Sequence, residues 1–190
     1  MATLAKRLIT ADEFLEIHWP DSDVKAELDN GVIRIIRMMA GGQGNHARIQ
    51  MNVSVALAIK LRGSGCSPYG SDMGIRTHEL SIRYPDVSVF CGRDGPENDK
   101  LKAFDDPKLV IEVLSPSTRD EDIKIKLLEY RNVTSLDAIL YIDPEDETIH
   151  LEVRNPARGW VVAPVGADGS VTLPLFDIVL TSEEIFARGR

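Results

Sequence analysis

The sequence is poor in cysteine and has no long apolar run, and each absence excludes a class of protein. It has two cysteines in 190 residues, with no CxxC pair and no Cys/His cluster. Neither a disulfide framework nor a zinc site is therefore expected, and the reducing cytoplasm is the default location. No stretch approaches the roughly 18 apolar residues of a membrane span, and the first residues lack the apolar segment of a signal peptide.

Positive charge is also scarce, and its distribution is uneven. The formal net charge is −8; residues 1–80 hold 9 Lys/Arg and 9 Asp/Glu, whereas residues 81–190 hold 13 and 21. This balance argues against passive, tight binding to nucleic acid, which relies on Lys and Arg at the phosphates. It still allows an enzyme that meets phosphates through a bound divalent cation, because such an ion inverts the local field.

The order of the predicted elements indicates one α/β domain over residues 1–190. Thr10 and Glu13 form a capping-box pattern for a short helix, "DNG" is a hairpin-turn signal, and residues 45–63 have helical spacing. The apolar runs "KLVIEVL" and "AILYID" are typical of strands buried on both faces, with a helix between them. We expect one mixed sheet flanked by helices, to which residues 156–190 add C-terminal strands and a last helix.

Two carboxylates stand inside runs that read as buried strands. "YPDVSVF" carries Asp86 and "KLVIEVL" carries Glu112. An unpaired charge is costly to bury, so an acid in such a place usually has a partner or a function. If the strands are neighbours, both acids can point to the same side, and they repel unless a proton or a cation lies between them. Oxygen ligands of this kind suit Mg²⁺ or Mn²⁺ rather than zinc. The alternative is that each acid pairs locally at a strand end.

The helix predicted after the second of these strands places a lysine on its core-facing side. Ile123, Leu127 and Tyr130 have the spacing of a buried stripe, and Lys126 belongs to the same stripe. One interpretation is an ion pair with Asp122, four residues earlier, worth a few tenths of a kcal/mol. The other is a lysine held beside the two acids, where it positions a water or neutralises developing charge. The spacing leaves both open.

Two further side chains are candidates for the same site. Glu27, just before the hairpin turn, is either a third metal contact or a charge at a strand edge. His46 begins the long helix and is either catalytic or, as for most histidines in such a place, structural or exposed. The glycines Gly41, Gly42 and Gly44 lack the strand and lysine of a phosphate-binding loop, so we interpret them as a flexible entry to the helix.

Together these residues resemble the Uma2 family, also called DUF820, of the PD-(D/E)xK nuclease superfamily. The resemblance rests on "ELDNG" from Glu27, on His46, and on "YPDVSVF", "DDPKLVIEVLSPSTRDEDIKIKLLEY" and "VTSLDAILYIDPEDETI". It covers about residues 10–155. It implies a restriction-endonuclease-like α/β core in which Asp86 and Glu112 bind Mg²⁺ and a lysine helps activate water for phosphodiester hydrolysis.

The sequence departs from the superfamily motif at that lysine. Leu114 stands two residues after Glu112, where the motif has lysine. The resemblance instead matches Lys126 on the following helix, with Tyr130 one turn later. This agrees with the core-facing stripe described above, so Lys126 is the predicted catalytic lysine.

The leading hypothesis is a Mg²⁺- or Mn²⁺-dependent endonuclease that acts on DNA, as a homodimer because many nucleases use two sites to cut two strands. Asp86 and Glu112 are its expected metal ligands, with Glu27 as a third, and Lys126 is the catalytic lysine. The secondary candidates are Tyr130, Ser115 and His46. The alternative hypothesis is a nuclease-like fold that binds or assembles without turnover, favoured by the acidic balance and the displaced lysine.

Overall fold

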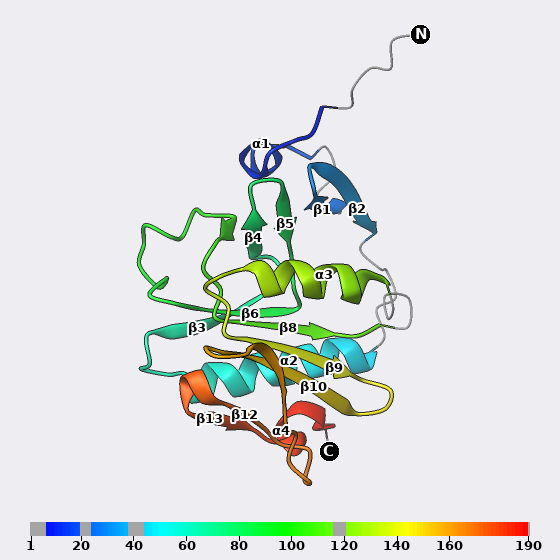
Figure 1. The fold of residues 1–190 in the computed structure, drawn as a ribbon, viewed down its shortest axis with the longest axis vertical. Coiled ribbons are helices and arrows are strands. Elements are labelled where there is room, and N and C mark those ends of the chain that lie inside the picture. The colour runs from blue at the N-terminus through cyan, green and yellow to red at the C-terminus, as the bar shows by residue number, and fades with distance from the viewer. Residues whose placement is uncertain (1–6, 20–23, 38–43, 116–120, 190) are drawn as a thin grey trace.

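A six-stranded mixed sheet forms the centre of the fold (Figure 1). The computed structural model describes residues 7–19, 24–37, 44–115 and 121–189, with the backbone alone at 24, 36, 37, 121 and 122. In spatial order the strands are β11 (Gly159–Ala163), β10 (Thr148–Asn155), β9 (Ala138–Asp143), β8 (Leu109–Val113), β6 (Val87–Cys91) and β3 (Cys66–Gly70). β8 and β9 are parallel, and all the other neighbours are antiparallel. The predicted mixed α/β class is confirmed.

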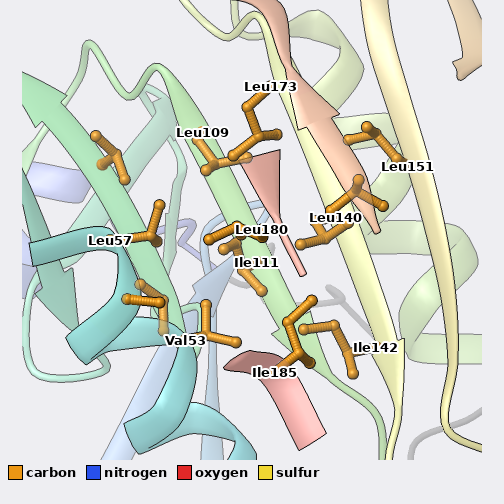
Figure 2. Close-up of a cluster of buried hydrophobic side chains, with 14 of the residues drawn as sticks. Val53, Leu57, Leu109, Ile111, Leu140, Ile142, Leu151, Leu173, Leu180 and Ile185 are labelled. Atoms are coloured by element: carbon orange, nitrogen blue, oxygen red, sulfur yellow. The ribbon is translucent and has the colours of Figure 1, made fainter. Parts of the chain in front are cut away.

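Helices α2 (Gly44–Lys60) and α3 (Glu121–Asn132) cover opposite faces of this sheet. Leu109, Ile111 and Val113 of β8 belong to the cluster that contains the buried side of α2, part of which is drawn in Figure 2. Val110 belongs to the other cluster, with Tyr130 of α3. Because β8 is buried on both faces, its sequence is nearly continuously apolar. Glu112 is the polar residue in this strand, and it shares the α3 face with Val110.

A second, five-stranded sheet stands beside the first, where the sequence predicted a single sheet. Its strands in order are β2 (Val32–Arg37), β1 (Val24–Asp29), β5 (Ser81–Arg83), β4 (Gly74–His78) and β7 (Ala103–Phe104). The short helix α1 (Ala11–Leu15) packs on it through Phe14 and Ala11. The sequence did not indicate β5 or β7 because runs of three and two residues are too short to show a period.

The hairpin of β1 and β2 follows the prediction from "DNG". Asp29 pairs with Val32, so the loop is the two residues Asn30 and Gly31, with φ of 48° and 79°. Two successive positive φ values define a type I′ turn, whose twist matches that of the strands and which glycine adopts without strain. The capping box of Thr10 and Glu13 is likewise present at the start of α1.

The C-terminal segment closes the α2 side of the large sheet. It consists of β12 (Val171–Leu173), the 3-10 turn η1 (Pro174–Phe176), β13 (Ile178–Leu180) and α4 (Ser182–Phe186). β12, β13 and α4 contribute Leu173, Leu180 and Ile185 to the core around α2 (Figure 2). Of the strands in residues 156–190, β11 extends the central sheet beside β10, whereas β12 pairs with β13 in a sheet of two. Among the described helices, none is long and apolar enough to cross a membrane.

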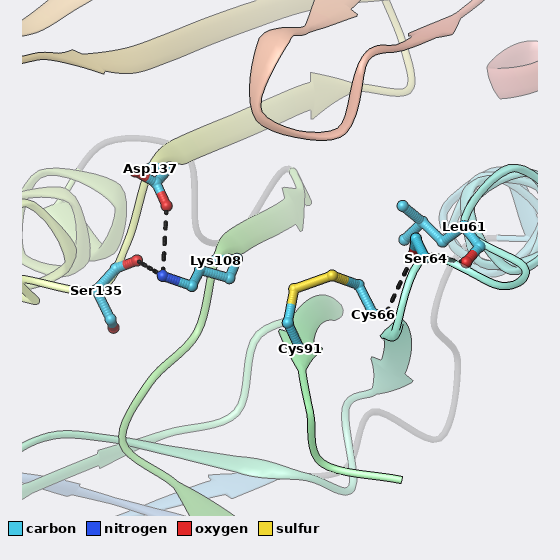
Figure 3. The surroundings of a disulfide bond; sticks show 7 residues. All are labelled: Leu61, Ser64, Cys66, Cys91, Lys108, Ser135 and Asp137. Atoms are coloured by element: carbon cyan, nitrogen blue, oxygen red, sulfur yellow. Dashed lines mark hydrogen bonds and ion pairs between the residues drawn. A yellow bond between two sulfur atoms is a disulfide. The ribbon is translucent and has the colours of Figure 1, made fainter.

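The two cysteines correct the expectation of reduced thiols. Cys66 of β3 and Cys91 of β6 are direct cross-strand partners, and the structure joins them in a disulfide (Figure 3). The pairing arises from the register of two strands that are 25 residues apart in the sequence. Because β3 did not show as a strand in the sequence, this proximity could not be predicted. The disulfide fastens edge strand β3 to the strand that follows Asp86.

Candidate active site

The register of β6 and β8 brings the two predicted acids together. Val87 pairs with Ile111, and Asp86 and Glu112 are the chain neighbours of these two paired residues. The Asp86 carboxylate accepts a hydrogen bond from the backbone N–H of Val113, the residue after Glu112. The exposed fractions of the Asp86 and Glu112 side chains are 17% and 13%, so both carboxylates are largely withdrawn from water. The structure therefore brings the two acids to the same end of the β6–β8 pairing, where the chain passes from the five-stranded sheet into the large sheet.

Asp86 lies one residue before β6, whereas the sequence predicted it inside the strand. Pro85 precedes it and has no N–H for a strand ladder, so the pairing begins only after these residues. Its carboxylate oxygen Oδ2 accepts a hydrogen bond of 2.7 Å from the backbone N–H of Val113. Helix α2 adds two contacts: His46 Nε2 lies 3.4 Å from Oδ2, and Gln50 Nε2 donates to the Asp86 carbonyl at 2.9 Å. Asp86 is thus held by both its side chain and its backbone.

His46 and Gln50 are one helical turn apart, so α2 presents both to the same residue. The hydrogen bond to Asp86 raises the pKa of His46, although partial desolvation opposes it. His46 was a secondary candidate in the sequence, and the structure places it against Asp86. Gln50 was not predicted; its position four residues after His46 was the available signal.

Glu112 is the most strongly perturbed acid of the site. Desolvation by burial raises its pKa to about 7; the nearby Lys126 lowers it, and the charge of Asp86 raises it. The hydroxyl of Tyr130 donates a hydrogen bond of 2.7 Å to Glu112 Oε1. An isolated carboxylate in this place is poorly tolerated, so ionised Glu112 needs more positive charge than Lys126 supplies.

Lys126 of α3 reaches the same carboxylate from above the sheet. Its Nζ lies 3.5 Å from Glu112 Oε1 and 3.3 Å from Glu27 Oε1. Burial lowers the pKa of Lys126, but the two carboxylates outweigh this effect and raise the pKa above its ordinary value. Lys126 is therefore a cation at neutral pH in the metal-free protein. The side chain of Asp122, the other partner considered for it, lies outside the described residues.

Glu27 of β1 belongs to a buried cluster of charges. Its Oε2 lies 3.1 Å from Arg83 NH1, and its Oε1 accepts a hydrogen bond of 3.2 Å from the backbone N–H of Tyr84. Arg83 also contacts Asp29 at 2.8 Å and Glu129 at 2.5 Å. Arg83 was not predicted to belong to the site. Its position two residues before the "PD" of an apolar segment could have indicated that it lies near Asp86. The cluster joins the five-stranded sheet to α3 directly behind Lys126.

Two hydroxyls on the α3 face of the large sheet extend the polar character of the site. Tyr141 of β9 pairs with Glu112 in the parallel register, and Ser88 of β6 pairs with Val110, which shares a face of β8 with Glu112. Within the described residues, the hydroxyls of Ser88 and Tyr141 are buried without a hydrogen-bond partner. Both hydroxyls lie on the face of the large sheet that carries Glu112.

The last sequence candidates lie at the edge of what the structure describes. Ser115 is partly buried and follows β8, directly before residues 116–120, which lie outside the described part. Gly44 is the first residue of α2, whereas Gly41 and Gly42 are outside the described residues. The predicted flexible entry to α2 therefore stays a prediction.

The donor set fits a hard divalent cation that takes its remaining ligands from solvent or substrate. Within the described residues no group of three His, Cys, Asp or Glu side chains is arranged to hold a metal ion. Mg²⁺ commonly binds through one or two carboxylates, together with waters and substrate phosphates, so the pair Asp86 and Glu112 is sufficient. A cation between them would also remove the repulsion and desolvation that disfavour ionised Glu112.

Comparison with known proteins defines first the class of fold and then the family. The fold is restriction-endonuclease-like: a crystal structure described as a "putative nuclease belonging to DUF820" from Anabaena variabilis ATCC 29413 matches with a TM-score of 0.70 at 22% identity, covering 94% of this chain and 98% of that one. The sequence model of the Uma2 family, described as "Putative restriction endonuclease", matches residues 11–182. The chain belongs to the Uma2 family.

Two uncharacterized proteins of Synechocystis sp. (strain ATCC 27184 / PCC 6803 / Kazusa) are similar over most of their length. One is 28% identical over 152 residues, which is 80% of this chain and 79% of that protein. The other is 31% identical over 144 residues, which is 75% of this chain and 79% of that protein. The names of these two proteins give no activity.

Proposed function

We propose that this protein is an endonuclease that hydrolyses phosphodiester bonds of DNA and that requires Mg²⁺, or Mn²⁺ in its place. The observation that carries the proposal is that Asp86 Oδ2 accepts the Val113 N–H, next to Glu112 in β8, while the Lys126 ammonium lies 3.5 Å from Glu112 Oε1. Two acids and a lysine in this relation match the needs of phosphodiester hydrolysis, in which charge develops on the phosphate oxygens. The family and the fold of the structural neighbour support it.

Asp86 and Glu112 would hold the divalent ion. When bound, the ion polarises the phosphate and lowers the pKa of the attacking water. The contacts of this chain keep the two carboxylates in place: Val113 N–H and His46 hold Asp86, and Tyr130 orients Glu112. Because these contacts already fix the two carboxylates, their side chains lose less conformational entropy when the ion binds.

Lys126 acts in this proposal as a fixed positive charge. The carboxylates of Glu112 and Glu27 raise its pKa, so the amine is protonated in the metal-free protein and donates hydrogen bonds. A protonated amine beside the reacting phosphate stabilises negative charge more strongly in a largely buried site than in water. Lys126 thereby takes the part that the superfamily motif assigns to a lysine on the strand.

The acidic balance of the chain bears on how DNA is met. With a net charge of −8, long-range attraction to phosphates is weak, so productive binding should depend on the divalent ion as well as on local contacts. Cutting both strands of a duplex needs two such sites, which is why we expect a homodimer in solution.

Calorimetry and plasmid nicking on the same samples test the proposal. The EDTA-treated protein should bind Mg²⁺ or Mn²⁺ and nick supercoiled DNA, whereas Glu112→Gln and Asp86→Asn should lose both. Glu183→Gln, an exposed acid of α4 on the opposite side of the sheet, is the matched control and should behave as wild type. Metal binding without nicking would contradict the proposal and favour the binding-module alternative. Wild type that binds neither ion would leave the two acids as structural groups.

A further inference from the structure

The position of Lys126 on a helix raises the question of what holds it over the site. A lysine has four rotatable side-chain bonds, and fixing it costs up to about 2 kcal/mol of side-chain entropy. Lys126 is nevertheless largely buried, with an exposed fraction of 19%, and its Nζ lies between the carboxylates of Glu112 and Glu27. If Glu112 holds a metal ion, its attraction for the lysine is weakened, and a second anion must keep the ammonium in place.

Glu27 has the contacts of such an anion. Its exposed fraction is 4%, and both of its oxygens are already engaged. Oε2 faces Arg83 NH1 at 3.1 Å, while Oε1 meets the Tyr84 N–H at 3.2 Å and Lys126 Nζ at 3.3 Å. A buried carboxylate that accepts hydrogen bonds from three donors is fixed in direction. To serve as a metal ligand it would have to give up one of these donors.

Arg83 keeps Glu27 pointed toward Lys126. Arg83 is 3% exposed, and its guanidinium spans Glu27, Asp29 and Glu129 at 2.5 to 3.1 Å. A planar guanidinium holds several carboxylates in one fixed arrangement, which a lysine in its place could not do. The five-stranded sheet therefore supplies, through β1 and β5, the two residues that stand behind the catalytic lysine.

We propose that Glu27 is the positioning residue of Lys126, held in turn by Arg83, and that it is not a third metal ligand. The catalytic meaning of this inference rests on the proposed nuclease function, whereas the positioning itself is a property of the folded chain. It explains why a lysine displaced from β8 to α3 can still act: the acid that fixes it comes from a different sheet.

Glu27→Gln separates the positioning role from metal binding. We expect kcat for plasmid nicking to fall by at least about tenfold, because misplacing a catalytic group by an ångström can cost that much or more. The Kd for Mg²⁺ should stay within about twofold of wild type, since the ligands Asp86 and Glu112 are unchanged. A tenfold rise in that Kd would show Glu27 to be a metal ligand and overturn the proposal, as would an unchanged kcat.

Glu129→Gln is the matched control. Glu129 contacts the same guanidinium at 2.5 Å and lies one turn after Lys126 on α3, so its substitution removes the same kind of charge from the same cluster. It leaves the Glu27 contact to Lys126 in place, so kcat should fall clearly less than in Glu27→Gln. If both variants lose activity equally, the effect belongs to the charge cluster as a whole and not to Glu27.

A readout without catalysis separates failure of this inference from failure of the proposed function. In ¹H–¹³C spectra of the metal-free protein, the Cε signal of Lys126, assigned with Lys126→Arg, should be shifted from those of mobile lysines. In Glu27→Gln the Lys126 signal should move to the chemical shift of the mobile lysines, whereas in Glu129→Gln its shift should not change. If the wild type does not nick DNA but shows this pattern, the nuclease proposal is contradicted and the positioning of Lys126 by Glu27 is supported. If the Cε signal of Lys126 does not change in Glu27→Gln, the positioning role of Glu27 is contradicted, even if the enzyme is active.

Should Glu27→Gln fail to fold, Glu27→Asp gives the same test. It keeps the charge for Arg83 but shortens the side chain by one methylene, which withdraws the carboxylate from Lys126 by roughly 1.5 Å. The same loss of kcat, the same Mg²⁺ affinity and the same change in the Lys126 signal are expected. A Glu27→Asp variant that nicks DNA at the wild-type rate with an unmoved signal would overturn the proposal.

Discussion

Removing the charge of Glu112 should change how the stability of the metal-free protein depends on pH. Burial raises the pKa of this carboxyl from its ordinary 4.5 to about 7 in the folded protein. Between these two values the folded state keeps a proton that the unfolded state has lost. The stabilisation is thus fully present below about pH 4.5 and is lost as the pH rises through about 7. Glu112→Gln cannot ionise and lacks this contribution.

The size of the effect follows from the two pKa values. A rise from 4.5 to about 7 corresponds to about 3 kcal/mol of unfolding free energy, of which roughly 2 to 3 kcal/mol is lost between pH 5 and pH 8. The assay is urea unfolding in EDTA at the two pH values, followed by circular dichroism. Wild type should lose that much more stability than Glu112→Gln on going to pH 8, and Glu183→Gln should follow wild type.

Equal pH dependence in wild type and Glu112→Gln would refute the reasoning. It would mean that Glu112 is ionised in the apo protein at little cost, so that Lys126 alone compensates the charge. The Glu112 carboxylate would then need no divalent cation to be stable in its ionised form. Addition of saturating Mg²⁺ provides an internal check, because an ion at Glu112 stabilises the ionised form and should flatten the wild-type dependence.

Two other predictions concern the frame of the site. Gly31→Ala should lower the unfolding free energy by more than about 1 kcal/mol, because φ is 79° and the new Cβ would lie 2.6 Å from Leu8 Cβ. Gly63→Ala is the control, because Gly63 has a similar φ of 81° but no atom within 4 Å of the new Cβ. It should lower the unfolding free energy by less than Gly31→Ala in the same urea titration. An equal loss in both variants would contradict a steric clash of the new Cβ with Leu8. Reducing the Cys66–Cys91 bond should cost about 3 kcal/mol, given its separation of 25 residues. Free thiols detected in protein purified without reductant would contradict the bond.

Local signals in the sequence predicted the parts of the fold that depend on near neighbours. The hairpin at Asn30 and Gly31, the capping box at Thr10 and the doubly buried strand around Glu112 all follow from residues close together in the chain. In these places propensity, capping and periodicity agree with the tertiary structure, which is the condition under which a sequence can be interpreted locally.

What could not be predicted depends on contacts between distant segments. The Glu27 and Arg83 pair joins residues 56 apart, and the short strand that carries Arg83 has no period to identify it. The division into two sheets and the Cys66–Cys91 bond have the same origin. For the site itself, the sequence proposed Asp86, Glu112 and Lys126, and the structure brings these side chains together. The network behind the lysine emerged only from the fold.

The rate at which the protein nicks supercoiled plasmid DNA tests the central claim most directly. The measurement compares EDTA-treated wild type, reloaded with Mg²⁺ or Mn²⁺, with Lys126→Gln purified in the same way, which controls for contaminating nucleases. The account predicts nicking that requires the divalent ion and that falls by about 100-fold or more in Lys126→Gln, as expected when a preorganised charge is removed from a buried site. Wild type that fails to nick with either ion, or a variant that nicks at the same rate, would contradict it.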